Sequence, residues 1–377
     1  MLLYTQKKDI HFEQHWEDYA KYYDIIDNSY PWVPEYIPKM KALNPNLKVI
    51  HYSSMIGIYG YPDYSYCSSR GWLLKDSSGQ IYQEPNWGAY LLDIGNPEAS
   101  HWLGQRLKGY IDEGYDGIFL DNTNPWSFYP VNIINPRTGQ PYWHYVKGPS
   151  SGPVSSDVFV NDMVSHLKIL KSYLPNSLII GNCINGATKY DFGYWDFQVE
   201  TDKIMKELDG AMNEYFVASS SDDLYSEEDW KADVDLLSRI PETKPNFIYV
   251  PTDRVGPWAG GGSDSQQGWY TFASFLLGVK YPEQTYLWAH NIEPATQSWA
   301  REIVSVDTGY PLGNYYKRSD GVYVREFSKV TVFVNPSSET RGGMSSHSGA
   351  VELQQPETLK LTVSSNPSGV PFSIRRL

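Results

Sequence analysis

The feature that most constrains the fold is an alternation of short apolar runs with segments of helical periodicity. In the clearest unit, apolar side chains recur at helical spacing from Trp102 to Ile111, and Gly114 then ends the helix. The apolar run 118–120 follows, and Asp121 comes directly after it. A strand that is apolar on both faces and follows a helix is typical of a parallel sheet covered by helices.

Similar apolar runs occur along most of the chain, and helical segments or long loops separate them. The expected strands are 2–4, 23–27, 47–52, 117–120, 178–182, 210–216, 246–250 and 284–288. Helices are expected at 12–22, 33–43, 156–173, 202–208, 227–238 and 266–277, besides the one before residue 114. Eight strands alternating with helices predict an α/β fold, a (β/α)8 TIM barrel over residues 1–311.

The pattern changes after residue 312. Short alternating runs at 323–327, 330–335 and 359–363 are separated by Gly and Pro pairs, and no helical periodicity remains. This predicts a small antiparallel β domain, a β-sandwich-like accessory domain at 312–377. Because this part contains no Trp, we expect it to stabilise the barrel rather than to bind carbohydrate.

Composition limits the partners and cofactors. A formal net charge of −13 without any basic cluster argues against nucleic acid. The chain has neither a signal peptide at its first residues nor an apolar stretch long enough for a membrane, so we expect a soluble protein with no membrane partner. Secretion stays possible through a signal absent from this chain, and the oligomeric state stays open. Cys67 and Cys183 exclude a disulfide framework, and no ligand spacing indicates a metal or an organic cofactor.

Two carboxylates stand where predicted strands end. Asp121 follows the fourth strand and Glu214 lies near the end of the sixth, and a barrel gathers its strand ends around one pocket. Hydrolysis of a glycosidic bond needs such a pair, and apolar neighbours would raise the pKa of a glutamic acid that donates the proton. We therefore predict Asp121 as nucleophile or base and Glu214 as acid. Asp121 could instead cap its loop, and Glu214 could form a structural ion pair.

Polar and aromatic groups at other strand ends suit a sugar, which offers hydroxyls to hydrogen-bond and flat ring faces to stack on. Aromatic residues make up 15% of the chain, which favours this interpretation. His51 could equally be structural, and Asp93 could bond the backbone of its own turn. The expected substrate-binding residues are His51, Tyr52, Asp93, Asn122, Trp126, Asn182, Asp253, Arg254, Trp288 and His290. Asp196, Glu200 or Asp253 could replace Glu214 in the pair.

Two motifs resemble known enzymes. The segment 92–97, Leu-Asp-Ile-Gly-Asn-Pro, precedes 114–122, Gly-Tyr-Asp-Gly-Ile-Phe-Leu-Asp-Asn. Together they resemble hypothetical glycoside hydrolase families with TIM barrels, related to endo-α-1,4-polygalactosaminidases and more remotely to α-amylase-like barrels. The resemblance implies a catalytic role for Asp121. In amylase-like barrels the acid commonly follows strand five, whereas here strand five ends with Asn182 and Glu214 follows strand six.

The sequence thus predicts a glycoside hydrolase acting on a poly- or oligosaccharide, without metal or organic cofactor. One alternative is a carbohydrate-binding protein that has lost catalysis and lacks a converging carboxylate pair. Another is a polysaccharide lyase, which would need cations to neutralise a uronate and a Tyr or His base. The strand ends supply mostly acids, so the lyase ranks last.

Overall fold

The computed structural model describes most of the chain. The described residues are 2–6, 12–29, 33–85, 87–125, 133–134, 157–184, 186–187, 198–218, 224–252, 264–288, 294, 297–337, 351–354 and 360–363.

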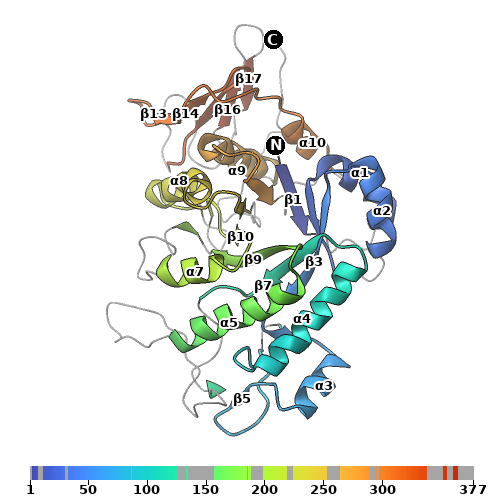
Figure 1. Ribbon diagram of the computed structural model, residues 1–377. Helices are drawn as coiled ribbons and strands as arrows, with labels where there is room; N and C mark the ends of the chain where they lie inside the picture. The colour runs from blue at the N-terminus through green and yellow to red at the C-terminus, as the bar shows by residue number, and fades with distance from the viewer. Residues whose placement is uncertain are drawn as a thin grey trace, which may run out of the picture.

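Eight parallel strands form the central sheet (Figure 1). They are β1 (Leu2–Gln6), β2 (Ile25–Asp27), β3 (Lys48–Ser54), β7 (Gly117–Asp121), β9 (Leu178–Ile184), β10 (Gly210–Asn213), β11 (Ile248–Pro251) and β12 (Tyr286–Trp288). Their order is β11-β10-β9-β7-β3-β2-β1-β12. Two parallel bridges, Tyr249 with Thr285 and Thr252 with Trp288, link β11 to β12. The two edges of the sheet therefore meet, and all eight predicted strands are present.

Helices that alternate with the strands, and one helix after the last strand, cover the outside of the sheet (Figure 1). They are α1 (Phe12–Tyr22), α2 (Val33–Leu43), α4 (Pro97–Asp112), α5 (Asp157–Tyr173), α7 (Gln198–Met205), α8 (Glu227–Thr243), α9 (Asp264–Gly278) and α10 (Ser298–Val304). Helix α4 begins after Asn96, whose side chain accepts a hydrogen bond from Glu98 N at 3.0 Å, with Pro97 in the first turn. Helix α10 was not predicted, because seven residues carry too little periodicity.

The long segment between β3 and α4 has its own small elements. Strand β4 (Gly57–Ile58) pairs with β6 (Tyr90–Leu91), and helix α3 (Asp63–Ser69) and β5 (Lys75–Asp76) lie between them. Strand β5 pairs with β8 (Ile133–Ile134). Helix α3 was not predicted either, because its sequence is rich in Ser and Tyr, which are mediocre helix formers.

Apolar side chains pack on both faces of the parallel sheet, the face under the helices and the opposite, inner face. Because successive strand residues point to opposite faces, every second residue faces inward. The inner cluster consists of Ile25, Ile50, Phe119, Ile180, Met212, Val250 and Trp288, with Tyr52 packed against it. Asp121, Asn182 and Glu214 come two positions after Phe119, Ile180 and Met212, so they continue this inward set at the carboxyl ends of three adjacent strands.

A five-stranded antiparallel sheet follows. Its strands are β13 (Tyr316–Lys317), β14 (Tyr323–Glu326), β15 (Thr331–Val334), β16 (Val351–Gln354) and β17 (Lys360–Val363), in that order. It packs on α9, at the end of the molecule opposite α3 (Figure 1). Buried Arg325 donates to the carbonyls of Leu276, Leu277 and Val279, where α9 ends. The predicted antiparallel β region is therefore present, while its division from the rest at residues 311 and 312 stays a prediction.

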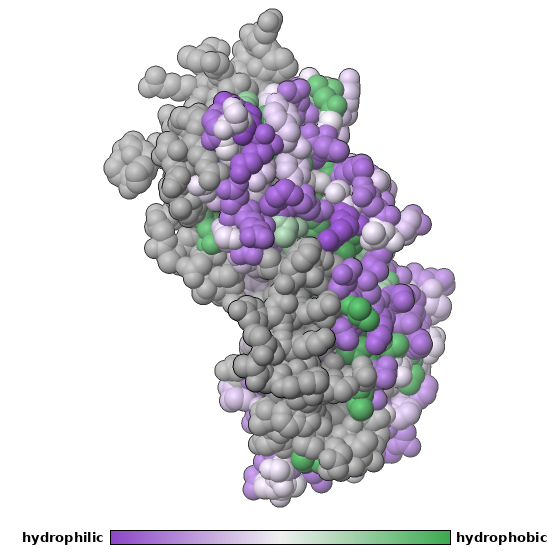
Figure 2. Space-filling view, turned by 90° about the vertical axis from the view of Figure 1, so that its left-hand side faces the viewer, coloured by the Kyte–Doolittle hydropathy of each residue, from purple (hydrophilic) through white to green (hydrophobic). Residues whose placement is uncertain are grey.

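The coloured part of the face shown in Figure 2 is largely hydrophilic. Hydrophobic residues appear on it as scattered spots (Figure 2). Within the described part of the chain, none of the helices has the length and apolar character needed to cross a membrane.

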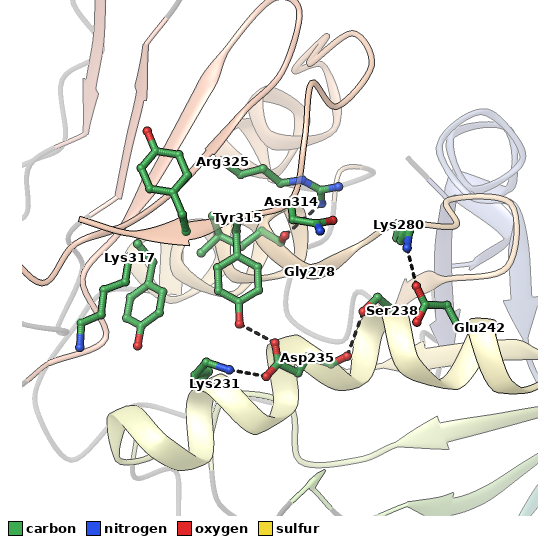
Figure 3. A pocket seen from close by; sticks show the side chains of 13 residues that line it. Lys231, Asp235, Ser238, Glu242, Gly278, Lys280, Asn314, Tyr315, Lys317 and Arg325 are labelled. Atoms are coloured by element: carbon green, nitrogen blue, oxygen red, sulfur yellow. Dashed lines mark hydrogen bonds and ion pairs between the residues drawn. The ribbon is translucent and has the colours of Figure 1, made fainter. Parts of the chain in front are cut away.

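A groove of about 550 Å³ lies between α8 and the antiparallel sheet. Four of its charged side chains form two ion pairs: Lys231 with Asp235, and Lys280 with Glu242 (Figure 3). Tyr315 also donates to Asp235. None of the residues that line the groove stands at a strand end of the parallel sheet. The groove is therefore separate from the strand ends at which the candidate catalytic carboxylates stand.

Candidate active site

Asp121 occupies the last position of β7 and is held on both carboxylate oxygens. Its Oδ2 accepts a hydrogen bond from the Tyr52 hydroxyl at 2.5 Å, and its Oδ1 accepts from the backbone N of Asn122 at 2.8 Å. Asn122 adopts a left-handed backbone conformation, with φ of 61°, so the chain turns back directly after the carboxylate. Burial, and secondarily the charge of Asp121, raises the pKa of Tyr52, so that this tyrosine stays protonated as a donor.

Asn182 joins the two predicted catalytic carboxylates. Its Nδ2 donates to Asp121 Oδ1 and to Glu214 Oε2, each at 3.0 Å. The two oxygens are therefore at most twice this distance apart, about 6 Å, and the roughly 120° between the two N–H bonds of an amide places them about 5 Å apart. The structure thus brings Asp121 and Glu214 together at the ends of β7 and β10, with Asn182 of β9 between them.

A buried network holds the backbone around Glu214. Asp233, on α8, accepts hydrogen bonds from Ala187 N at 2.7 Å and Val217 N at 2.9 Å, and from the Asn213 side chain at 3.3 Å. Asn213 directly precedes Glu214, and its Oδ1 accepts from Gly186 N at 2.7 Å. Burial raises the pKa of Asp233 to about 7, although its three donors act in the opposite direction. One carboxyl group thus links the segments after β9 and β10.

A third carboxylate lies close by, in the segment between β3 and α4. Glu84 is buried, and its Oε2 accepts from Trp87 N at 2.6 Å. With Tyr59, Trp87, Ser54 and Asn122 it lines a small notch. Burial and, after it, the charges of Asp121 and Glu84 raise the pKa of Tyr59. Asn122, whose backbone N–H donates to Asp121, is among the residues that line the notch. The notch therefore adjoins the Asp121 site.

Three of the predicted substrate-binding residues gather at Asp121. Tyr52 and Asn182 donate to its carboxylate with their side chains, and Asn122 donates with its backbone. Trp288 lies in the inner apolar cluster, 6.4 Å from Phe119 between ring centroids. It therefore forms part of the floor beneath the polar groups.

Three other predicted residues lie apart from this group. His51 faces the helices: its ring stacks on Tyr110 of α4, 3.5 Å between centroids, and meets Tyr115 edge-on. Burial lowers its pKa to about 4, so the imidazole is neutral near pH 7, and its ring contacts are structural ones under α4. Asp93 accepts from Gly95 N at 3.2 Å in the turn before α4, which is the backbone role left open above. Glu200 lies in the first turn of α7, not at a strand end.

Other predicted residues lie outside the described part of the chain. These are Trp126, Asp196, Asp253, Arg254 and His290. Among the residues that the structure describes, no group of three or more His, Cys, Asp or Glu side chains is placed to hold a metal ion.

Sequence reasoning missed Tyr59, Glu84 and Asp233. The first two lie in the aromatic segment after β3, whose length and composition indicated function without singling out a residue. Asp233 could have been noticed as an acid on the apolar face of α8, between Trp230 and Val234.

Comparison with known proteins identifies the family of this chain and structures that share its fold. Residues 41–331 match the model of Hypothetical glycosyl hydrolase family 15. A maltogenic α-amylase, AmyB from Thermotoga neapolitana, has 10% identity and a TM-score of 0.53, covering 89% of this chain and 86% of its own. A sulfoquinovosidase from E. rectale has 10% identity and a TM-score of 0.52, covering 80% of this chain and 46% of its own. At such identities the two structures show a shared fold alone.

Proposed function

This chain belongs to Hypothetical glycosyl hydrolase family 15 and is a glycoside hydrolase, and we propose that Asp121 and Glu214 are its catalytic carboxyl groups. The observation that carries the proposal is the single Asn182 amide nitrogen that donates to both carboxylates. Retaining glycosidases place their two carboxyl groups about 5–5.5 Å apart, and inverting ones about 6.5–9.5 Å. A separation of at most about 6 Å therefore favours retention, with Asp121 as nucleophile.

In the first step, a carboxylate oxygen of Asp121 attacks the anomeric carbon while Glu214 gives its proton to the glycosidic oxygen. The bond to the leaving sugar breaks, and an ester joins the remaining sugar to Asp121. Tyr52 and Asn182 hold the plane of the Asp121 carboxylate by hydrogen bonds to its two oxygens. A nucleophile fixed before reaction avoids the entropic cost of orienting it in the transition state.

In the second step, Glu214 takes a proton from water, whose oxygen attacks the anomeric carbon and releases Asp121. Two inversions at the same carbon leave the product with the configuration of the substrate. The substrate class that fits is a poly- or oligosaccharide, because the half-exposed rings of Tyr59 and Trp87 offer stacking faces next to the site.

We also propose that the eight parallel strands and their helices form a complete (β/α)8 barrel. The two bridges between β11 and β12 support this closure, since they connect the ends of the strand order. In such barrels the catalytic groups lie at the carboxyl ends of the strands, where Asp121, Asn182 and Glu214 stand. The antiparallel sheet would be the accessory domain beyond residue 311.

The experiment is to measure release of reducing ends from a panel of neutral, amino and acidic polysaccharides. We expect Asp121→Asn and Glu214→Gln each to lower kcat by about a thousandfold or more, because each removes one half of the mechanism. Glu200→Gln, a matched change on α7, is expected to keep wild-type activity. Activity within tenfold of wild type in either catalytic variant refutes the assignment.

The stereochemistry is tested separately. Proton NMR of the first product, recorded before mutarotation, is expected to show the anomer of the substrate. Appearance of the opposite anomer first would show that Asp121 acts as a base on water, in contradiction to the separation seen here.

A further inference from the structure

The notch beside Asp121 is built by residues that also build the catalytic site. Asn122, whose backbone donates to Asp121, sends its side chain toward Ser54 Oγ at 3.5 Å, and both residues line the notch. Ser54 is also the register partner of Asp121 across β3 and β7. The notch is therefore lined by two direct neighbours of the proposed nucleophile, one along the chain and one on the adjacent strand.

Glu84 supplies the chemistry of the notch. The side chain is 4% exposed, and one of its oxygens already accepts the Trp87 N–H. A carboxylate has about four lone-pair sites on two oxygens, so it can accept hydrogen bonds from several partners at once. Buried carboxylates favour partners that donate hydrogen bonds or carry positive charge.

The size of the notch limits what can enter. Its volume is about 10 Å³, close to the room that one water molecule needs. Ile56, Ala89 and Leu91 form apolar walls around it. One hydroxyl or one ammonium group fills such a space, whereas an acetamido group with four heavy atoms would extend beyond it.

On the proposed function, we infer that this notch receives the substituent on carbon 2 of the sugar that binds against Asp121, and that it accepts a hydroxyl or a protonated amine but rejects N-acetyl. Carbon 2 is next to the anomeric carbon that Asp121 attacks, so its substituent lies nearest to the residues around this carboxylate. Contacts to this substituent are also among those that strengthen in glycosidase transition states. Glu84 is thus a specificity-determining residue.

The test measures binding instead of turnover, so that it does not depend on catalysis. The Asp121→Asn variant is titrated calorimetrically with matched oligomers of glucose, glucosamine and N-acetylglucosamine, and with the galacto series. We expect the hydroxyl and amine forms of one series to bind about tenfold or more tightly than the acetylated form, since rejection by a fitted pocket has this size. Only the binding of the amine form is expected to weaken as the salt concentration rises.

Two further variants separate charge from size. Glu84→Gln keeps an oxygen for the Trp87 N–H and is expected to weaken binding of the amine form about tenfold. Glu98→Gln on α4 is the matched control, and we expect it to leave binding unchanged. Ala89→Gly widens the notch and is expected to reduce the difference in affinity between the acetylated form and the other two forms. Equal binding of all three forms, or unchanged selectivity in Glu84→Gln, overturns the inference. Hydrolysis that persists in Asp121→Asn, with the binding selectivity intact, would refute the proposed catalytic pair alone.

Discussion

Replacing Asp233 by Asn should change how the stability of this protein depends on pH. Asp233 is fully buried on α8 and accepts three hydrogen bonds, from Ala187 N, Val217 N and the side chain of Asn213. Burial disfavours the charged form of the carboxyl, whereas the three donors favour it. Burial is the larger effect and raises the pKa from 3.8 to about 7.

The expected magnitude follows from this shift. A carboxyl with a raised pKa in the folded state binds its proton more tightly there than in the unfolded chain. The stability due to this proton is fully present below pH 3.8 and is lost as the pH rises through about 7. Each pKa unit is worth about 1.4 kcal/mol, so the full change is about 4 kcal/mol.

The assay is urea denaturation of the wild type and of Asp233→Asn between about pH 4 and about pH 8. The difference between their free energies of unfolding isolates Asp233, because all other titrating groups are common to both proteins. We expect the wild type to lose about 4 kcal/mol relative to the variant over this range. A flat difference would show that the three donors cancel the effect of burial, and a difference that grows in favour of the wild type with pH would show that they outweigh it.

Two further substitutions test other parts of the structure. Tyr52→Phe removes a donor to Asp121, and kcat/KM should fall about 10- to 100-fold with an unchanged melting temperature; a change below about threefold would contradict the positioning role. Arg325→Met leaves buried carbonyls at the end of α9 without their donor and should lower the free energy of unfolding by about 3–5 kcal/mol, measured by urea denaturation. The exposed control Arg318→Met should cost under about 0.5 kcal/mol, and a similarly small cost for Arg325→Met would refute the argument.

The neighbours His51 and Tyr52 show where sequence reasoning reached its limit. Both follow the third strand and both were predicted to bind substrate, but adjacent strand residues point to opposite faces. Tyr52 faces Asp121, and His51 faces Tyr110 under α4. The run 47–52 is apolar on both faces at its start, so its pattern does not reveal which face is inward.

The site residues divide in the same way. Asp121 and Glu214 could be predicted as a pair, because carboxylates at strand ends of a parallel barrel converge whatever lies between them. Glu84 and Tyr59 could not, because they lie in a segment without periodicity, where no rule connects sequence position to direction.

The sequence by itself determined the order of the eight sheet strands and of the longer helices, the parallel sheet and the two acids at its carboxyl end, because apolar periodicity and chain direction are local properties. Only the tertiary structure decided that one Asn182 nitrogen serves both acids and that Glu84 adjoins Asp121. Those relations depend on the register of β7, β9 and β10 and on the path of a loop. Register and loop path are set by packing between segments far apart in the chain, which no local pattern records.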